Sequence, residues 1–488
     1  MKRPGLVLIA SVLVFSPRLS AQNQTGPTYV VTTLTDRNNS TAKVDDCSLR
    51  EAIRAATAAN VPAMITFKEG LKGTLLLSAS FGQLTLTKPV KILGPGARSL
   101  IISGGGNQRV FRTSGGPHLI SGMTLQGGRI SGTEGGGGIW NSGTLTIENC
   151  TVSGNQVTSS PGFVARGGGI YTTGTLSLIR STLSGNSATG GNGIGGSAGS
   201  DGYGGGVFNE GDLSALQCTF QGNTGTGGDG GDRKGFACGA IYIHADGGAV
   251  LDSCTVSGNV ATGGTREVKP SPAIGGIFSE GTCSVTSSVI AGNTATGFAS
   301  HPDVRGSFSS GGYNLIGATT GFPANDYPVN AFNKPTDQRG TEVSRKDPKL
   351  DSLKDNGGAV NTMLPLAGSP LIDKGKSSAE LLDQRGYLRL VDEEAIVNAS
   401  GGNGTDIGAV ERGAPVPSEV MFFNGSALVT LKGDAGAIYQ FEYSDDLQPP
   451  WTELEGEVKV ADGGGRLLFV DPGVLPDRRF YRAVKVVP

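Results

Sequence analysis

The chain has 488 residues, enough for two or three domains, and 81 of them are glycine, against a usual share of about 7%. Lys and Arg number 40 and Asp and Glu number 42, so the net charge is −2, and no run of like charge stands out. This balance argues against nucleic acid or an anionic membrane surface as a partner.

The first segment, residues 1–21, has the pattern of a secretory signal peptide. Lys2 and Arg3 form a positive start, an apolar run from Leu6 to Phe15 follows, and Leu19-Ser20-Ala21 offers a cleavage site. An uncleaved anchor helix is the alternative, but the apolar run is short for a membrane span. We therefore expect export, an extracellular or outer-surface location, and no transmembrane span in the mature chain.

A helix is predicted over residues 45–60, in the stretch DDCSLREAIRAATAAN. Ser48 and Glu51 have the spacing of a capping box, and Asn60 supplies an end. The expected apolar face consists of Leu49, Ala52, Ile53 and Ala56. We expect this helix to cap one end of a repeat structure, because solenoids need caps on their terminal repeats.

Five similar segments of about twenty residues occupy the middle of the chain. They end at Asn155, Asn186, Asn223, Asn259 and Asn293. A Gly/Ser/Thr-rich loop of variable length joins each segment to the next. Within a segment, two alternating runs are separated by a corner, and a third short run follows each Gly cluster, which indicates three short strands per repeat. The sequence therefore predicts an all-β fold, a right-handed parallel β-helix over residues 28–317.

Two stacked rows are expected inside this β-helix. The repeated Asn residues should form a hydrogen-bonded ladder rather than a metal or sugar site, each after a Gly whose corner requires a positive φ. Cys150, Cys218 and Cys254 share one repeat position, which Ser fills in the other two repeats, so buried thiols are favoured over disulfides. Cys47, Cys238 and Cys283 complete the set, and no Cys/His spacing indicates zinc.

Several motifs support a family resemblance. CSLREAIRAATAAN resembles the N-terminal CSLREA motif of large exported bacterial proteins, and the repeats are similar to their β-helix repeats and to those of polymorphic outer-membrane proteins. Residues 355–375, then DQRG (383–386) and DIGAVE (406–411), resemble the choice-of-anchor Q domain. The resemblance covers roughly residues 28–413 and implies a secreted or surface β-helix protein whose residues 318–413 form the C-terminal end of the β-helix.

A small all-β module, residues 418–488, is expected after a linker, GAPVPSEV. Its strands should be ALVTLKG, AIYQFEYSDD, WTELEGEVKV, GRLLFVD and RRFYRAVKVV, and alternation of Tyr439, Phe441 and Tyr443 indicates a sandwich-like unit. It is similar to small C-terminal modules of exported bacterial proteins. The sequence leaves two interpretations: a module for sorting or surface attachment, or a folded appendage without such a role.

The sequence does not contain the carboxylate motifs that are typical of β-helix hydrolases. Two loop clusters offer acidic and basic groups of the kind that lyases use: Asp229, Asp232, Arg233 and Lys234, and His301, Asp303 and Arg305. Both are interpreted as solvated loops. Asp383, Arg385, Asp406 and Glu411 are expected to pin irregular chain over the end of the β-helix. The pairs Asp45-Asp46 and Asp445-Asp446 lie in the helical segment and the end module.

The favoured function is binding, adhesion or display without a catalytic centre, because rigid stacks with variable loops suit that role. The alternative is a polysaccharide lyase or glycosidase of pectate-lyase-like fold. A cluster of carboxylates with Arg or Lys on the outer face of adjacent coils would distinguish the two, and the repeats place Thr, Ser and Asn there instead. We expect a monomer whose partners are extracellular glycans or cell-surface components. We expect no cofactor and no metal, and no motif indicates a Ca²⁺ ion in a loop.

Overall fold

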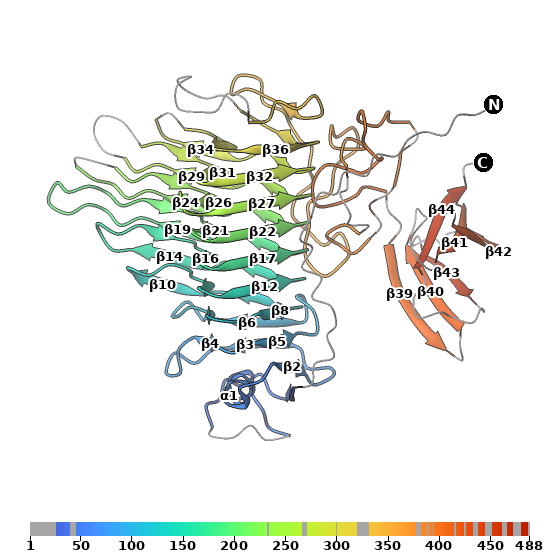
Figure 1. Cartoon of the computed structure of the whole chain (residues 1–488), viewed down its shortest axis with the longest axis horizontal. Coiled ribbons are helices and arrows are strands. Elements are labelled where there is room, and N and C mark those ends of the chain that lie inside the picture. Colours follow the sequence, from blue (N-terminus) through green and yellow to red (C-terminus); the bar gives the residue numbers. More distant parts are fainter. Residues whose placement is uncertain are drawn as a thin grey trace.

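The computed structural model of the chain describes residues 26–39, 45–231, 234–265, 271–298, 300–319, 331–376, 382–387, 389, 391–393 and 395–413, and six strands between residues 416 and 486. The described part is nearly all β, and its parallel sheets stack many short strands into a parallel β-helix (Figure 1). The signal-peptide prediction lies outside the described residues.

Three parallel sheets, which we call faces 1 to 3, enclose the core. Face 1 contains β1 (Thr28–Val31), β2 (Ala63–Phe67), β5 (Val90–Leu93), β8 (His118–Ser121), β12 (Thr144–Glu148), β17 (Thr175–Ile179), β22 (Asp212–Leu216), β27 (Gly248–Asp252), β32 (Thr282–Thr286) and β36 (Ser309–Gly312). Face 2 contains β3 (Gly73–Leu76), β6 (Leu100–Ser103), β9 (Thr124–Gln126), β13 (Thr151–Ser153), β18 (Thr182–Ser184), β23 (Thr219–Gln221), β28 (Thr255–Ser257), β33 (Val289–Ile290), β37 (Leu315–Ile316) and β38 (Gln338–Arg339). Face 3 contains β4 (Leu84–Leu86), β7 (Phe111–Thr113), β11 (Ile139–Asn141), β16 (Ile170–Thr172), β21 (Val207–Asn209), β26 (Ile241–Ile243), β31 (Ile277–Ser279) and β35 (Val304–Gly306).

The segments expected as variable loops form two further sheets, which is a correction to the three-strand repeat. They project from the stack between faces 2 and 3, and we call them arms 1 and 2. Arm 1 contains β10 (Arg129–Gly132), β14 (Gln156–Ser159), β19 (Ser187–Thr189), β24 (Thr224–Thr226), β29 (Val260–Thr262) and β34 (Thr294–Thr296). Arm 2 contains β15 (Ala165–Arg166), β20 (Gly202–Tyr203), β25 (Ala237–Cys238) and β30 (Ala273–Ile274).

Small residues let the two arms pack closely. Ala237, Ala261 and Ala273 form one buried cluster between them. A Cβ added at Gly202 would lie 2.0 Å from the carbonyl oxygen of Thr226, so no larger residue fits there. The Gly/Ser/Thr-rich composition of these segments therefore allows two sheets to pack closely, and it does not only indicate flexible loops.

The predicted ladder and corners are confirmed. The amide Nδ2 of each ladder Asn donates to Oδ1 of the Asn in the next coil, over 2.8–2.9 Å, from Asn155 up to Asn293. Each preceding Gly has a positive φ, as expected, from +62° at Gly154 to +73° at Gly292. A non-glycine residue with positive φ turns the chain between faces 1 and 2, for example Asn149 at 52°.

The cysteines are all buried and free, as predicted. Cys150, Cys218 and Cys254 lie in the core with no exposed surface. Burial raises the pKa of Cys150 and Cys238 to about 12, so these thiols stay protonated near neutral pH.

Helix α1 (Leu49–Ala59) caps the first coils, as predicted (Figure 1). Ser48 and Glu51 form the capping box, and Asn60 ends the helix in a left-handed conformation. Leu49, Ile53 and Ala56 belong to the same buried cluster as the strand core. No helix within the described ranges is long and apolar enough to cross a membrane.

The described residues between 341 and 413, which we call the strap, do not sit over the end of the β-helix, contrary to the prediction. They lie along the outer side of face 2, where Gln384 bonds to Thr182 and Thr219 and the backbone N–H of Ala409 donates to Thr255. Figure 1 shows this segment beside the stack and not on its end. Arg98, near the first coils, pairs with Asp355 over 2.6 Å, and Ser287, near the last coils, donates to the carbonyl of Lys376. The outward hydroxyls of face 2 give the strap many hydrogen-bonding partners. The last coil also extends beyond residue 317, because β38 joins face 2.

The C-terminal module consists of two three-stranded antiparallel sheets. One contains β39 (Val416–Phe423), β40 (Ser426–Lys432) and β43 (Arg466–Asp471), and the other contains β42 (Thr452–Val460), β41 (Ile438–Ser444) and β44 (Phe480–Val486). The predicted strands are present, but most of the predicted linker belongs to β39. Pro417 is tolerated there because β39 is an edge strand.

Candidate functional site

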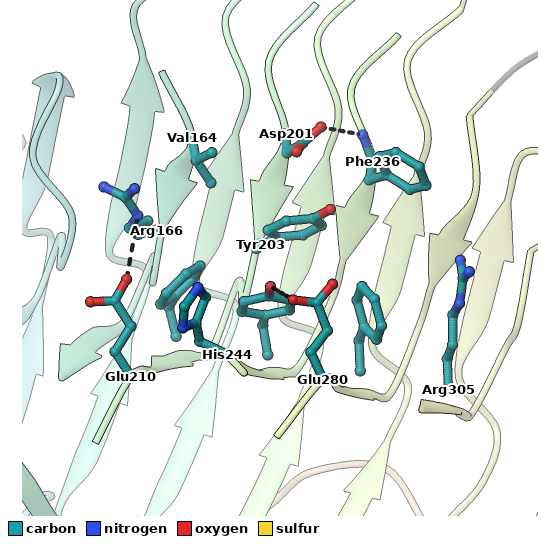
Figure 2. Close-up of a pocket in the computed structure, with 12 residues that line it drawn as sticks. Val164, Arg166, Asp201, Tyr203, Glu210, Phe236, His244, Glu280 and Arg305 are labelled. Atoms are coloured by element: carbon teal, nitrogen blue, oxygen red, sulfur yellow. Dashed lines mark hydrogen bonds and ion pairs between the residues drawn. The ribbon is translucent and has the colours of Figure 1, made fainter. Parts of the chain in front are cut away.

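A crevice of about 450 Å³ opens where arm 2 meets face 3 (Figure 2). Side chains from three stacked levels of arm 2 and four of face 3 reach it, so it runs along the axis of the β-helix. Its lining comprises Val164, Arg166, Asp201, Tyr203, Phe208, Glu210, Phe236, Tyr242, His244, Phe278, Glu280 and Arg305.

The floor of the crevice is a packed aromatic cluster. Phe208, Tyr242 and Phe278 occupy the central, outward position of β21, β26 and β31, in register with one another. Tyr203 of arm 2 stacks on Tyr242 with ring centroids 4.4 Å apart and an interplanar angle of 7°. The Arg305 guanidinium lies 5.3 Å from the centroid of Phe278. Because these rings cover one another, the floor excludes water but offers little free ring face to a ligand.

Three polar side chains form a row above this floor, and we call Glu210, His244 and Glu280 the rim. Each follows the last residue of its face 3 strand. Their backbone N–H groups continue the parallel ladder, donating to carbonyls one coil earlier over 2.8–2.9 Å. The rim residues are therefore stacked on three consecutive coils, at the inter-strand spacing of about 4.8 Å.

Tyrosine hydroxyls hold both rim carboxylates. The Tyr171 hydroxyl donates to Glu210 over 2.7 Å, and the Tyr242 hydroxyl donates to Glu280 over 2.6 Å, each from the preceding coil. Burial, and then the hydrogen bond to the carboxylate, raise the pKa of both tyrosines, so both hydroxyls remain donors. The same Tyr–Glu hydrogen bond therefore occurs twice, two coils apart.

The middle rim residue breaks this pattern. The preceding coil has Phe208 where the other two have Tyr, so no strand hydroxyl reaches His244 from that position. Its Nδ1 lies 3.2 Å from a carboxylate oxygen of the exposed Asp246. The rim therefore presents an imidazole between two anchored carboxylates.

Charge in the crevice is mixed, with a small acidic excess. Asp201, Glu210 and Glu280 contribute three negative charges, and Arg166 and Arg305 contribute two positive ones, which leaves one negative charge when His244 is neutral. Arg166 lies 3.8 Å from Glu210. The expectation that outer positions carry only Thr, Ser and Asn is wrong at this crevice.

The first predicted loop cluster does not form a site in the described residues. Asp229 accepts bonds from the backbone and hydroxyl of Thr265, over 2.7 and 2.9 Å, and so ties neighbouring loop tips together. The carbonyl of Lys234 accepts a bond from Ser271. Asp232 and Arg233 lie outside the described residues.

The second predicted cluster is divided between two structural roles. Asp303 is buried and accepts the Nδ2 of Asn293 over 2.9 Å, so it ends the Asn ladder. Burial raises the pKa of Asp303 to about 6. Arg305 lines the crevice, whereas His301 is buried and pairs with Ile274 at the edge of arm 2. The interpretation as a solvated loop is therefore wrong for His301 and Asp303, and the three residues serve different structural roles.

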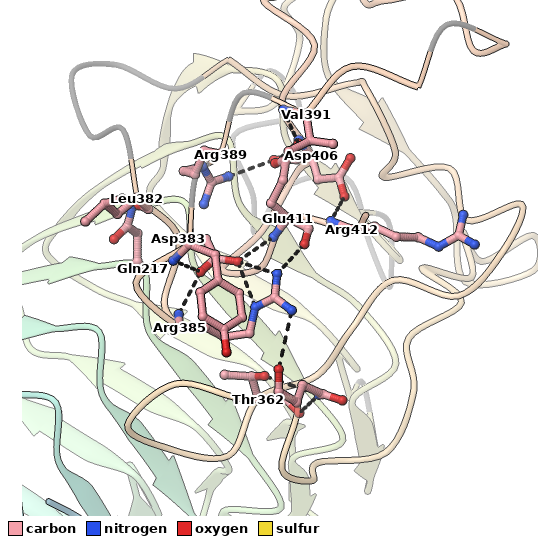
Figure 3. Close-up of polar contacts among 12 residues, drawn as sticks. Gln217, Thr362, Leu382, Asp383, Arg385, Arg389, Val391, Asp406, Glu411 and Arg412 are labelled. Atoms are coloured by element: carbon pink, nitrogen blue, oxygen red, sulfur yellow. Dashed lines mark hydrogen bonds and ion pairs between the residues drawn. The ribbon is translucent and has the colours of Figure 1, made fainter. Parts of the chain in front are cut away.

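The predicted structural network in the strap is confirmed (Figure 3). Arg385 pairs with Asp383 over 2.8 Å, and its guanidinium also donates to the carbonyl of Glu411. The side chain of Asp406 accepts backbone N–H groups of Asp373 and Arg412 over 2.9 and 2.7 Å. All four predicted carboxylate and guanidinium residues are buried, so the network holds the strap's fold and presents no open face.

The CSLREA segment is also structural. Glu51 accepts the backbone N–H of Ser48, and Asp46 pairs with Arg37. Arg50, whose role the sequence did not reveal, binds both oxygens of Asp36 over 2.8 and 2.9 Å. Asp445 and Asp446 lie outside the described residues.

Sequence reasoning missed the rim, although the repeats contained a signal for it. The aligned segments FNEG and FSEG place Glu210 and Glu280 at one repeat position, and IHADG places His244 there. Only the folding of arm 2 against face 3 turns this position into the edge of a crevice.

Within the described residues, no group of three or more His, Cys, Asp or Glu side chains is placed to hold a metal ion. Neither comparison with known proteins identifies a relative: no family model matches the chain, and no curated protein matches it. The resemblance to CSLREA and choice-of-anchor Q proteins therefore rests on the sequence motifs alone.

Proposed function

We propose that this protein is an exported or cell-surface β-helix that binds a glycan in the crevice between arm 2 and face 3. The observation that carries the proposal is the crevice, where hydrogen-bonding side chains from consecutive coils converge over a dry aromatic floor. A concave site with a few convergent polar groups is the usual form of a binding site. Export and membership of the CSLREA and choice-of-anchor Q family are part of this proposal.

The chemistry of the lining favours a neutral glycan. Sugar hydroxyls both donate and accept hydrogen bonds, and the crevice offers carboxylate acceptors in Glu210 and Glu280 and guanidinium donors in Arg166 and Arg305. The excess of one negative charge disfavours a polyuronate, because like charges repel at close range. Since the aromatic faces are covered, affinity should depend on hydrogen bonds more than on ring stacking.

The rigid stack supports a binding role. The five ladder asparagines are almost completely buried and hydrogen-bonded from coil to coil, so neighbouring rim residues are held at a fixed separation. Preorganised polar groups lose little entropy when a ligand binds.

A binding assay tests the proposal. Isothermal titration should detect binding of the mature protein to soluble oligosaccharides from β-glucan, mannan, xylan or galactan, and weaker or no binding to oligogalacturonate. Glu280→Ala should weaken binding at least tenfold, equivalent to about 1.4 kcal/mol. Glu148→Ala is the matched control, because Glu148 pairs with Arg180 elsewhere on the stack. Equal affinity of Glu280→Ala and wild type would contradict binding in the crevice.

A further inference from the structure

We infer that Glu210 and Glu280 act as a general acid and general base that hydrolyse a glycosidic bond with inversion of configuration. This inference rests on the proposed glycan binding in the same crevice. It goes beyond that proposal, because binding alone requires no particular separation between the two carboxylates.

The first argument is the separation of the two carboxylates. Asn209, Ile243 and Ser279 end their strands in register, so Glu210 and Glu280 follow equivalent positions two coils apart. Two inter-strand spacings of about 4.8 Å amount to about 9.6 Å, which is at the upper end of the separation found in inverting enzymes. Inverting glycosidases separate their carboxyl groups by about 6.5–9.5 Å, whereas retaining enzymes need about 5–5.5 Å.

The second argument is that both carboxylates are held in the same way. Tyr171 and Tyr242 occupy one register position, and each donates a short hydrogen bond to the Glu of the next coil. The shared Tyr anchor favours the two-coil translation of the backbones for the carboxyl groups, and Arg166 also lies 3.8 Å from Glu210. His244 occupies the intervening coil, so the gap between the two carboxylates lies over an imidazole and not over a third carboxylate.

The reaction balances without a cofactor. One carboxylic acid gives its proton to the glycosidic oxygen as the bond from that oxygen to the anomeric carbon breaks. The other carboxylate takes a proton from a water molecule whose oxygen forms a new bond to the anomeric carbon from the opposite side. The products are a free hydroxyl on the leaving sugar and a hemiacetal of inverted configuration.

Tyr171 and Tyr242 are positioning residues in this scheme. Each hydroxyl fixes one carboxylate through a bond of 2.6–2.7 Å and touches no reacting atom itself. Loss of one hydroxyl should therefore lower kcat more than it changes KM, and should shift the pH–rate profile.

The experiment measures cleavage of the oligosaccharides that the protein binds. Wild type should release reducing ends from a bound β-glucan, mannan, xylan or galactan oligosaccharide, and proton NMR should show the inverted anomer in the first product. Glu210→Gln and Glu280→Gln should each lower kcat by about two to four orders of magnitude while keeping binding within a few fold. Tyr242→Phe should lower kcat less and shift the pH profile. Glu148→Gln is the control for which full activity is expected.

The outcomes separate this inference from the proposed function. Binding without release of reducing ends overturns the hydrolytic pair and leaves the binding proposal standing. A first product of retained configuration, or full activity in either Gln variant, overturns the pair as well. Absence of binding to every oligosaccharide overturns both proposals. Unchanged melting temperatures of the Gln variants show that any lost activity is not a loss of fold.

Discussion

Asn293 and Asp303 form the last rung of the internal ladder: one carboxylate oxygen of Asp303 accepts both the side-chain Nδ2 and the backbone N–H of Asn293, over 2.9 and 3.2 Å. Every lower rung is an Asn, whose Nδ2 needs an acceptor above it. At the top of the stack no further Asn follows, and a carboxylate supplies the acceptor. Asp303 therefore ends the Asn ladder, whereas helix α1 caps the first coils of the stack.

Removing the terminal acceptor should destabilise the stack. Asp303→Ala leaves two buried donors of Asn293 without a partner, so we expect a loss of about 1–3 kcal/mol for each donor that stays unsatisfied. Asp303→Asn keeps an acceptor and should cost clearly less. Urea unfolding of both variants measures the difference. Equal stabilities of the Ala and Asn variants would show that the rung does not contribute as described.

Arg50 should be the residue of the CSLREA motif on which the N-terminal cap depends most. It binds Asp36 through two nitrogens and donates to the carbonyl of Gly82, and both charged side chains are at most 9% exposed. Arg50→Ala leaves a buried carboxylate without its partner, which costs about 3–5 kcal/mol. Thermal melting and light scattering should show lower stability and aggregation through the uncovered first coil.

Arg54→Ala provides the matched control on the same helix. Arg54 is exposed and contacts only Asn38 among the bonds that the structure shows for it, so its loss should change stability by less than about 0.5 kcal/mol. A similar loss for both variants would contradict the role given to Arg50.

Gln384 should hold the strap on face 2. Its Nε2 donates to the carbonyl of Ser181 and the hydroxyl of Thr182, and its Oε1 accepts the hydroxyl of Thr219, all in buried surroundings. Gln384→Ala should cost about 1–3 kcal/mol and make the strap more sensitive to limited proteolysis. The protease should cleave the Asn398→Ala variant, which is changed at an exposed position of the strap, at the same rate as wild type. If the two variants are cut at the same rate, Gln384 is not the anchor.

Stability should fall as pH rises from about 4 to about 7. Burial raises the pKa of Asp373 and Asp303 to about 6 and of Asp406 to about 7, and it raises the pKa of Glu411 well above its usual value. In this window these four carboxyl groups bind more protons in the folded chain than in the unfolded chain, so their titration favours unfolding as pH rises. Melting temperatures measured across this range should therefore decrease toward neutral pH.

A variant pair locates the source of this pH dependence. Asp406→Asn should flatten the decrease, because the amide does not titrate. Asp212→Asn, at an exposed strand position, should leave it unchanged. A melting temperature that rises from pH 4 to pH 7 in wild type would contradict the assignment of these carboxylates.

The local rules of the chain predicted much of the fold. The capping-box spacing of Ser48 and Glu51 placed helix α1, because both hydrogen bonds form within one turn. The recurrent Gly-Asn pairs placed the ladder, since the glycine allows the corner and each amide can bond to its copy in the next coil. The Cys/Ser exchange at one repeat position indicated buried thiols correctly.

Other features could not be read from local patterns. The arms looked like loops because Gly, Ser and Thr dominate them, and their strands form only because two such segments pack against each other. The strap lacks periodicity, so its path along face 2 follows from contacts with residues far away in the chain, such as Gln384 with Thr182. Asp303 was interpreted as part of a solvated loop, because nothing near it in the sequence shows that it is buried against Asn293.

By itself, the sequence determined that this chain stacks short strands into a parallel β-helix with a helical cap, because repeat spacing and capping act over a few residues. Only the tertiary structure decided where the strap lies and where function should be sought. Glu210 and His244 are 34 residues apart in the chain and His244 and Glu280 are 36 apart, and the coil-to-coil register places all three in one row beside arm 2. A crevice is a property of two packed sheets, and no single repeat contains it.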